Sequence, residues 1–458
     1  FPEHTNATMT GISSPADNLL VNNTQEGGFF KYNLATTSWI RLSVAYGVAS
    51  INDINGVPYY YPNLYSAYLS VSQGQTINIH ASHSADFATN GIWTWDKSFN
   101  IIMNGHDIII NNCSNILANG AYTFNITGGG SISMNDNNIN HGVFKVGGGV
   151  TFNSDKTVNI FHSTTGSLRG AFQHSGTGNS HINGFLTKGN TGFCYKGGTG
   201  IMYVNDGILD DEGSPSEMVY GDYVNVSNSI IIGRVYRISG SYTISDRKTV
   251  RRFINCSIIS TNSYAIGQRS AIFDNCTIRT VGYEINSGIG GTQEYNNCTL
   301  ECLDYTGFAF NPTNSSVFTI SGGSLYSDGK GIYSNSTFTL NDVRIFTIDT
   351  GVESRIEETS SDKFTINKGS IESSTGHCLI SNAQTIIDFN PVIINGTTLI
   401  SNTTGRYCIF AGTQNLIKFS KLKLKNTATA TDVYSRSDIP TENPQTNTED
   451  TKGNIILN

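Results

Sequence analysis

The sequence predicts an all-β protein whose main body is a right-handed single-stranded parallel β-helix with about 24 residues per coil. One observation is that charged residues make up only 14% of the chain, below the roughly 25% of an average soluble protein. A second is the abundance of Gly, Asn, Ser, Thr and β-branched residues with only 9 Pro, which favours strands and tight turns over helices. A third is a short segment that recurs along the chain, as the strands of a solenoid do.

The recurring segment is an Asn-Cys-Ser/Thr sequence inside an alternating strand. It occurs as FINCSIIS at Cys256, IFDNCTIRT at Cys276 and EYNNCTLEC at Cys298. The equivalent position is expected later at Gly323, Val343, Gly369, Thr397 and Leu422, and earlier at Asn228, Asp206, Gly184, Val158, Gly130 and Ile108. The average step between these positions is about 24 residues, which predicts one coil per step.

Each coil is expected to hold three short strands, because a second apolar pair recurs between these positions, as in SYAIG, GYEIN and TGFAF. A β-sandwich would also show short strands every 8 to 12 residues or so, and only the longer repeat favours the solenoid. The three Cys would then point inward and stack at about 4.8 Å. We interpret them as small buried hydrophobic side chains in preference to a redox or metal site. The preceding Asn255, Asn275 and Asn297 would form a hydrogen-bonded ladder along a turn.

The repeat also divides the chain into three regions. Residues 1–70 do not follow the period and are expected to cap the helix, since an open coil exposes unpaired backbone and apolar core. Residues 71–426 form the β-helix, and the polar residues 427–458 are expected to form an extended C-terminal arm. Trp93 and Trp95 share one strand face near the first coils, where they would form a cap or a subunit contact, or bind sugar rings.

Charge and motifs argue against several classes of function. The net charge of -7 argues against nucleic acid as a partner, because phosphate-binding surfaces need an excess of Lys and Arg. No run approaches the roughly 20 apolar residues needed to cross a bilayer. No charged and apolar leader is expected at the start of the given sequence, although the numbering begins at Phe1 and an upstream segment could have been removed. The sequence shows no metal-ligand motif, nucleophile elbow or phosphate loop, which predicts no metal and no cofactor.

A long Asn- and Gly-rich β-helix between an irregular N-terminal segment and a polar C-terminal extension resembles the bacteriophage tailspike and capsule depolymerase family of pectate-lyase-like β-helices. The resemblance covers residues 71–426 and is one of architecture and composition. It implies a homotrimer on the virion, at the phage tail or baseplate and therefore extracellular. It also implies that the protein cuts a bacterial surface polysaccharide, capsule or O-antigen, by hydrolysis or by β-elimination. The family's usual virion-binding head domain is not evident in this chain.

Hydrolysis of a glycosidic bond needs two carboxyl groups, one to protonate the leaving oxygen and one to activate water or attack the sugar. Coils about 4.8 Å apart can supply the required separations, so acidic residues on neighbouring coils are the candidates. One loop region concentrates them, with catalytic candidates at Asp206, Asp210, Asp211, Glu212, Glu217 and Asp222. The next coils bring substrate-binding candidates at Arg234 and Arg237. The alternative is that all these charges are solvated loop residues and ladder partners.

A second candidate group lies farther along the chain. Three residues beyond the cysteine position, outward by strand alternation, lie Arg279, Glu301, Tyr326, Phe346 and Glu372. The catalytic candidates of this group are Glu284 and Glu301, and the substrate-binding candidates are Arg269, Arg279 and Tyr326. Arg279 and Glu301 would otherwise be an exposed ion pair between coils, and Tyr326 and Phe346 would pack against a neighbouring subunit instead of a sugar.

These residues predict a polysaccharide depolymerase that works by carboxylate-based glycoside hydrolysis. A polysaccharide lyase is the first alternative, and it would need a base and a group that neutralises a uronate. His162, His174 and His181 are candidates for the base. A non-catalytic adhesin is the second alternative, in which the same surface presents Tyr, Asn and Arg for sugar binding alone.

Overall fold

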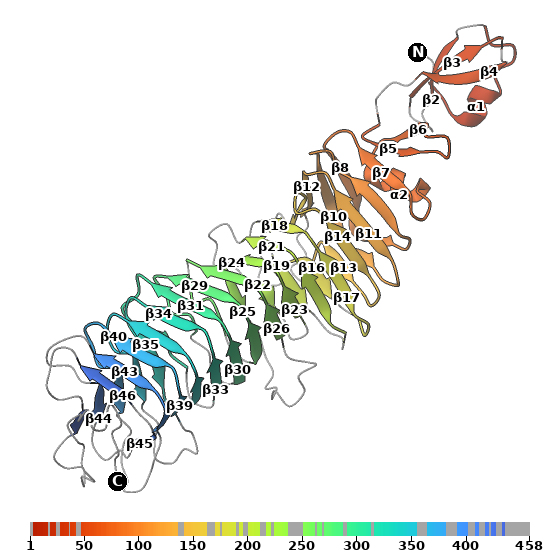
Figure 1. The fold of residues 1–458 in the computed structure, drawn as a ribbon. Coiled ribbons are helices and arrows are strands. Elements are labelled where there is room, and N and C mark those ends of the chain that lie inside the picture. The colour runs from red at the N-terminus through yellow and green to blue at the C-terminus, as the bar shows by residue number, and fades with distance from the viewer. Residues whose placement is uncertain are drawn as a thin grey trace. The chain divides into compact units, whose positions relative to one another are not determined.

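The structure, a computed structural model, confirms an all-β chain of stacked parallel coils (Figure 1). It describes residues 3–16, 19–23, 28–35, 37–42, 47–135, 142–162, 170–174, 176–188, 192–195, 200–210, 217–220, 224–236, 251–261, 263–267, 270–286, 291–312, 316–354, 364–381, 392–401, 408–411, 417–420, 423–426 and 433–435. The chain divides into two compact units, Phe1–Gly200 and Ile201–Asn458. Coils of about 24 residues, most of them with three short strands, make up the second unit and the first unit from residue 76 onward, as the repeat predicts.

The first unit begins with a small sheet of its own. Its elements are β1 (Glu3–His4), α1 (Asn6–Thr10), β2 (Leu20–Asn23), β3 (Gly28–Asn33) and β4 (Ser38–Leu42). The strands pair in the order β1-β2-β3-β4, and the last three are antiparallel. Buried Met9, Val21 and Phe30 form its core against Ile12, Leu19 and Trp39.

The next segment caps the first coil. It contains β5 (Ala49–Asn52), β6 (Pro58–Tyr61) and α2 (Leu64–Ser70). Strand β5 pairs antiparallel with both β6 and β7 (Thr76–Ile79), which covers the edge of the first parallel sheet. Tyr68 of α2 packs against Trp93 and Trp95, with ring centroids 5.6 and 6.4 Å away. Both Trp side chains are buried, so they are part of the core beneath this cap and no sugar can reach them.

Three parallel sheets follow in the first unit. Sheet 1 consists of β7, β9 (Phe99–Ile102), β11 (Thr123–Thr127), β14 (Thr151–Ser154) and β17 (Ser180–Asn183). Sheet 2 consists of the first halves of β8 (His83–Trp95) and β10 (Asp107–Ala118), then β12 (Ser131–Asn135), β15 (Asn159–His162) and β18 (Leu186–Lys188). Sheet 3 consists of the second halves of β8 and β10, then β13 (Phe144–Val146), β16 (Gly170–His174) and β19 (Gly192–Tyr195).

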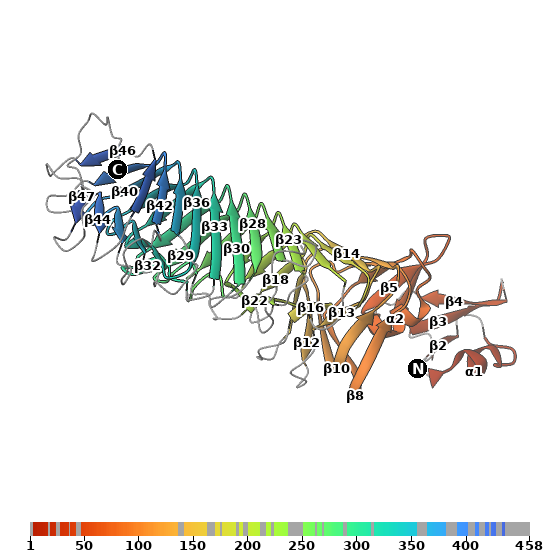
Figure 2. The ribbon, with the colours of Figure 1, turned by 90° about the horizontal axis from the view of Figure 1, so that it is seen from below.

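The second unit repeats this arrangement. Its sheet 1 contains β20 (Met202–Asn205), β23 (Val224–Ser227), β26 (Arg251–Ile254), β28 (Ala271–Asp274), β30 (Gly291–Asn296), β33 (Ser316–Ser321), β36 (Thr337–Asn341), β39 (Phe364–Asn367), β42 (Val392–Asn395) and β45 (Ile417–Ser420). Figure 2 shows β28, β30, β33 and β36 side by side, and each is parallel to the next. The register of these strands places like side chains above one another from coil to coil.

Sheets 2 and 3 of the second unit run beside it. Sheet 2 contains β21 (Ile208–Asp210), β24 (Ile230–Ile232), β27 (Ser257–Ser260), β29 (Thr277–Val281), β31 (Thr299–Leu303), β34 (Ser324–Ser327), β37 (Arg344–Thr347), β40 (Ser370–Ser373), β43 (Thr398–Ser401) and β46 (Lys423–Asn426). Sheet 3 contains β22 (Glu217–Tyr220), β25 (Arg234–Tyr236), single bridges at Ile266 and Asn286, then β32 (Phe308–Phe310), β35 (Lys330–Ser334), β38 (Val352–Ser354), β41 (Leu379–Ser381), β44 (Ile409–Ala411) and β47 (Val433–Ser435). Strand β47 pairs with β44, so sheet 3 extends past residue 426.

The interior is filled by columns of like side chains. Phe253, Phe273 and Tyr295 occupy successive register positions of sheet 1, with stacked rings whose centroids are 5.0 and 4.9 Å apart. Phe338 stacks in the same way on Phe318 and Phe364. Alternation of buried and outward residues along each strand produces these columns, because successive side chains point to opposite faces.

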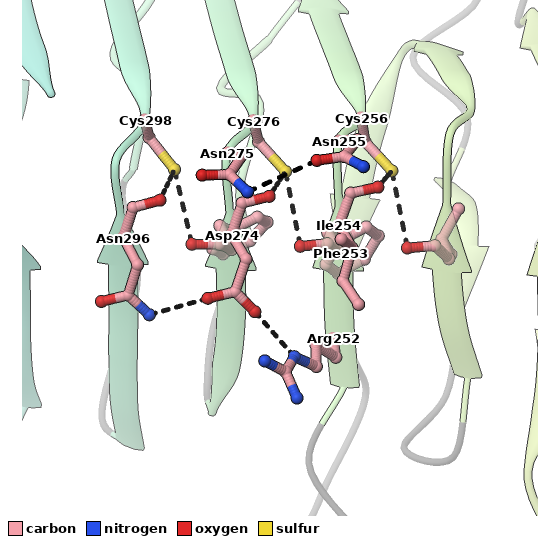
Figure 3. Close-up of polar contacts among 12 residues, drawn as sticks. Arg252, Phe253, Ile254, Asn255, Cys256, Asp274, Asn275, Cys276, Asn296 and Cys298 are labelled. Carbon is pink, nitrogen blue, oxygen red and sulfur yellow. Dashed lines mark hydrogen bonds and ion pairs between the residues drawn. The ribbon is translucent and has the colours of Figure 1, made fainter.

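The cysteines form the expected interior column (Figure 3). Cys256, Cys276 and Cys298 are buried, and each thiol donates to backbone carbonyl oxygens at 3.4 to 3.5 Å. The predicted Asn ladder is confirmed for two of its three members, since Asn275 donates to Asn255 Oδ1 at 3.5 Å and Asn255 donates to Asn228 Oδ1 at 3.2 Å. The recurrent Asn-Cys pair therefore has a structural role, with the thiol inside and the amide on the turn.

The register differs from the expected one at four positions. Ser229 and Gly207 are the equivalents of Cys256, one residue after the predicted Asn228 and Asp206. In the first unit Phe185 replaces the predicted Gly184 as the equivalent of Val158, and His106 replaces Ile108 as the equivalent of Gly130. The cause is visible in the backbone of three of them: Asp206, Asn228 and Gly184 have φ of 59°, 50° and 61°. They are left-handed turn residues like Asn255, whose φ is 52°, and they precede the interior position.

This turn conformation makes a stability prediction for Asn275, whose φ is 54°. Asn275→Ala should destabilise the protein by about 1–2 kcal/mol, because an Ala side chain is disfavoured in the left-handed region and the ladder hydrogen bond is lost. Asn275→Gly loses the same hydrogen bond but adopts this φ freely, so it should be about 1 kcal/mol more stable than the Ala variant. Urea unfolding followed by circular dichroism measures both. Equal stability of the two variants would contradict the turn assignment.

Candidate active site

The outward residues of sheet 2 in the second unit form a continuous row. Strand pairing places Arg279 beside Glu301, Glu301 beside Tyr326, and Tyr326 beside Phe346, on four successive coils. Glu372 follows beside Phe346. The register predicted for this group is confirmed, and we call these five residues the outer row. The structure thus brings three predicted site residues, Arg279, Glu301 and Tyr326, onto neighbouring coils of one face.

Charge on the outer row is partly paired. Arg279 Nε lies 3.4 Å from Glu301 Oε2, and the two side chains are 49% and 34% exposed. Ion pairs this exposed contribute at most about 1 kcal/mol to stability, because water screens them. Since the pair adds little to folding, both groups remain available to contact a polar ligand.

The aromatic part of the outer row is a stacked pair. The rings of Tyr326 and Phe346 have centroids 5.4 Å apart and planes inclined by 9°. Each ring therefore has one face covered by the other. A sugar can stack only on the outer faces of the pair, toward Glu301 or toward Glu372, and cannot lie across both rings as on a continuous floor.

Two tyrosine–carboxylate pairs lie where the strands of sheet 2 lead into sheet 3. Tyr305 donates its hydroxyl hydrogen to Glu284 Oε2 at 3.0 Å. Tyr326 donates to Asp328 Oδ1 at 2.9 Å, and the backbone N–H of Asp304 donates to Asp328 Oδ2 at 2.8 Å. Asp328 thus has a hydrogen bond on each carboxylate oxygen, whereas the bond to Glu284 is on Oε2 alone.

Hydrogen bonding and burial change the acidity of these tyrosines. Burial, followed by the hydrogen bond to Glu284, raises the pKa of Tyr305 to about 12. The hydrogen bond to Asp328, followed by burial, also raises the pKa of Tyr326. Both hydroxyls stay protonated at neutral pH, so they serve as donors that orient carboxylates. A general base for elimination would need a lower pKa, which argues against either tyrosine in that role.

Sequence reasoning identified Glu284, Glu301, Arg279 and Tyr326 but missed Asp304, Tyr305 and Asp328. These three residues follow the strands and do not lie on the alternating positions within them. The sequence does contain a signal for the two aspartates, because each directly follows a strand of sheet 2. Asp304 follows Leu303, the last residue of β31, and Asp328 follows Ser327, the last residue of β34. The turn at Asp304 has a φ of 52°, which ends the alternation on which the prediction depended.

The structure describes only part of the first candidate group. Asp206 is a turn residue, and Asp210 ends β21 in register with Ile232. Glu217 of β22 lies in register with Arg234 of β25, so these two predicted residues are on neighbouring strands. The Arg234 guanidinium lies over the Tyr264 ring, 5.8 Å from its centroid. Predicted residues that lie outside the described part of the chain are Asp211, Glu212, Asp222, Arg237 and Arg269.

The histidines considered for elimination do not share a surface. His162 and His174 are buried, and His181 is exposed. His174 hydrogen-bonds to Ser180 Oγ at 2.9 Å through Nδ1, and burial lowers its pKa. His162 and His174 lie on β15 and β16 of one coil. Two of the three histidines are therefore inaccessible to a polysaccharide.

The cysteine column makes a prediction about reactivity. The hydrogen bond with Cys276, followed by burial, raises the pKa of Cys256. For Cys276 the bond with Cys256 lowers the pKa, but the bond with Cys298 and burial raise it overall, to about 12. Since thiolate is the reactive form, iodoacetamide should leave both residues unlabelled in the folded protein and label them after denaturation. Peptide mass spectrometry measures this, and rapid native labelling of Cys276 would contradict an interior column.

No metal site and no membrane span is found in the part of the chain that the structure describes. Within those residues, no three His, Cys, Asp or Glu side chains are grouped so that they could hold a metal ion. The described helices are too short or too polar to cross a membrane.

Comparisons with known proteins identify no relative by sequence. No protein family and no curated protein matches the chain. Among solved structures, the chain is similar to the periplasmic alginate epimerase AlgG, at 10% identity and a TM-score of 0.26, over 77% of this chain and 85% of that one. A double mutant of the same epimerase matches over 84% of this chain and 95% of that one, at 10% identity and a TM-score of 0.24. Scores this low say nothing about the chemistry of this chain.

Proposed function

We propose that this protein is a polysaccharide depolymerase that hydrolyses glycosidic bonds on the outer face of the second unit. The observation that carries the proposal is the pair of hydrogen-bonded carboxylates, Glu284 with Tyr305 and Asp328 with Tyr326, beside the outer row. Hydrolysis needs two carboxyl groups on either side of the scissile bond, together with groups that hold the sugars.

The two carboxylates suit different roles. Asp328 accepts a hydrogen bond on each oxygen, which holds it in one orientation, as a base that activates water requires. Glu284 is held through Oε2, and its other oxygen can deliver a proton to the leaving oxygen. They lie two coils apart, about 10 Å along the stack. That distance is closer to the roughly 6.5–9.5 Å of inverting enzymes than to the roughly 5 Å of retaining enzymes.

The neighbouring residues suit substrate binding. Glu301, paired with Arg279, can accept hydrogen bonds from sugar hydroxyls one coil before Tyr326. Tyr326 is 36% exposed, so part of its ring can contact one sugar. The acidic loop with Asp206, Asp210, Asp211, Glu212, Glu217 and Asp222 stays a second candidate site within the same proposal.

The biological setting is also part of the proposal. A charge-poor β-solenoid with an outward site is compatible with a homotrimeric phage tail protein that acts outside the cell on capsule or O-antigen. Tyr305, whose pKa is raised to about 12, stays protonated and is therefore a poor base for an elimination. Neither nucleic acid nor a metal is needed for this reaction.

Incubation with bacterial surface polysaccharides tests the proposal. Purified capsule and O-antigen from a panel of strains should be shortened, with new reducing ends and without the ultraviolet absorbance of unsaturated uronates. Absorbance that grows with cleavage would show a lyase. Binding without any new reducing ends would show an adhesin. Either result would overturn the hydrolase assignment.

A further inference from the structure

Helix α2 is attached to the first coil through the side chain of His83. His83 begins β8 in register with buried Ile108, two residues before buried Ala85, so it occupies an inward position of the coil. The backbone N–H of Leu64, the first residue of α2, donates to His83 Nε2 at 3.0 Å. His83 Nδ1 hydrogen-bonds to the carbonyl oxygen of Ala81 at 3.1 Å. Both ring nitrogens are therefore engaged, one of them with the capping helix.

These two contacts fix the protonation state of the ring. A carbonyl oxygen only accepts and a backbone N–H only donates, so Nδ1 carries the proton and Nε2 offers its lone pair. Protonation of Nε2 would set two N–H donors against each other, and the hydrogen bond from Leu64 would be lost. That bond therefore exists only with a neutral ring. Burial lowers the pKa of His83, the bond to Ala81 opposes this, and the nearby His106 lowers the pKa further.

The other titratable groups near His83 make different contacts. The described segments next to it carry Tyr60 and Tyr61 of β6, Tyr65 and Tyr68 of α2, His80, Asp86, Asp96, His106 and Asp107. The carboxylates of Asp86 and Asp107 accept hydrogen bonds from the next coil. Asp96 accepts from the Tyr68 hydroxyl at 2.6 Å and so supplies a second polar contact beneath α2. Since carboxyl groups titrate near about pH 4 and imidazoles near about pH 6.5, the two contacts of α2 respond to different pH ranges.

Helix α2 covers apolar and aromatic surface at the end of the core. It buries Leu64, Ala67 and Tyr68, and the Tyr68 ring packs against Trp93 and Trp95. Release of α2 would bring these side chains into contact with water, whereas the parallel coils beyond them would stay paired. The hydrogen bond from Leu64 therefore acts on one local element of the cap.

From this geometry we infer that His83 is an acid-sensitive switch, which holds α2 on the first coil at neutral pH and releases it when the ring takes up a proton. The inference does not depend on the proposed function, because it concerns the capped end of the first unit. The pKa of His83 is lower with α2 in place, so the open form binds the additional proton. Opening therefore becomes more favourable as the pH falls below about 6.5, and the attachment is complete above that pH.

Hydrogen exchange of the native protein from about pH 8 to about pH 4.5 tests the inference. Protection factors, which correct for the intrinsic pH dependence of exchange, should fall about fivefold or more by about pH 5 for the amides of Leu64, Ala67 and Val71. The fall should begin near about pH 6.5, and strands β28 and β30 should keep their protection. Constant protection of α2 would overturn the inference. So would a fall that begins only below about pH 5, which would indicate Asp96, or an equal fall in every strand.

Two glutamine variants localise the effect. His83→Gln offers the Leu64 N–H an acceptor oxygen that does not titrate, so the protection of α2 should no longer depend on pH over this range. His80→Gln is the control: His80 Nε2 hydrogen-bonds to Ser50 Oγ at 2.7 Å, and a hydroxyl can donate or accept, so that bond survives protonation. This variant should keep the native pH dependence. A fall that persists in His83→Gln, or disappears in His80→Gln, would refute the switch, and the onset in the native protein decides should His83→Gln not fold.

Discussion

Asp328→Asn should lower the rate of polysaccharide cleavage by about 10²- to 10⁴-fold, the range that a general acid or base contributes. Asn has nearly the same shape, so the hydrogen bond from Tyr326 at 2.9 Å can persist. The amide cannot take a proton from water, and its nitrogen cannot accept from the Asp304 N–H. Reducing-end release at saturating substrate measures the effect.

The control for this variant is Asp349→Asn. Asp349 is half-buried like Asp328 and follows β37 on the next coil, where its Oδ1 accepts from Thr350 Oγ1 at 3.3 Å. The Asp349→Asn variant should cleave the polysaccharide at a rate within about threefold of that of the native protein. Full activity of Asp328→Asn would remove the base from the mechanism. If Glu284→Gln were also fully active, the catalytic site would have to lie elsewhere, with the loop around Glu217 as the next candidate.

The largest stability effect is expected from Trp95→Ala, at about 3–5 kcal/mol. Trp95 is fully buried, and its ring packs against Phe99, Phe124 and Phe144, with centroids 4.8 to 5.2 Å away. Truncation would leave a cavity that rigid neighbouring coils cannot fill, since each strand is fixed by pairing on both sides. Urea unfolding followed by far-ultraviolet circular dichroism measures the loss.

Ile92→Ala on the same strand is the control for Trp95→Ala. Ile92 is 59% exposed, so its truncation should change stability by no more than about 0.5 kcal/mol. A loss below about 1 kcal/mol for Trp95→Ala would contradict the packing described for the capped end of the first unit.

The fold could be predicted because each coil repeats a position at which only a few residue types fit. In the Asn-Cys pairs at Cys256, Cys276 and Cys298, the Asn adopts the left-handed turn and the small Cys fits the buried position that follows. Counting from them placed Arg279, Glu301 and Tyr326 correctly on one face. The count is one residue early at Asn228 and Asp206, because there a left-handed turn residue directly precedes the interior position.

The candidate site could be predicted only in part. Alternation within strands locates outward residues such as Glu301, but it stops at the turns, where Asp304, Tyr305 and Asp328 lie. Their association depends on hydrogen bonds between residues of different coils, such as Tyr305 to Glu284. No pattern local to one strand contains that information, because it depends on how far each turn extends before the next strand begins.

A crystal structure with an oligosaccharide product bound tests the central claim most directly. We expect sugar oxygens within hydrogen-bonding distance of Glu284 and Asp328, and one sugar ring in contact with the exposed part of Tyr326. An oligosaccharide bound instead on the outer face of sheet 1, or at the loop around Glu217, would contradict the assignment of the active site.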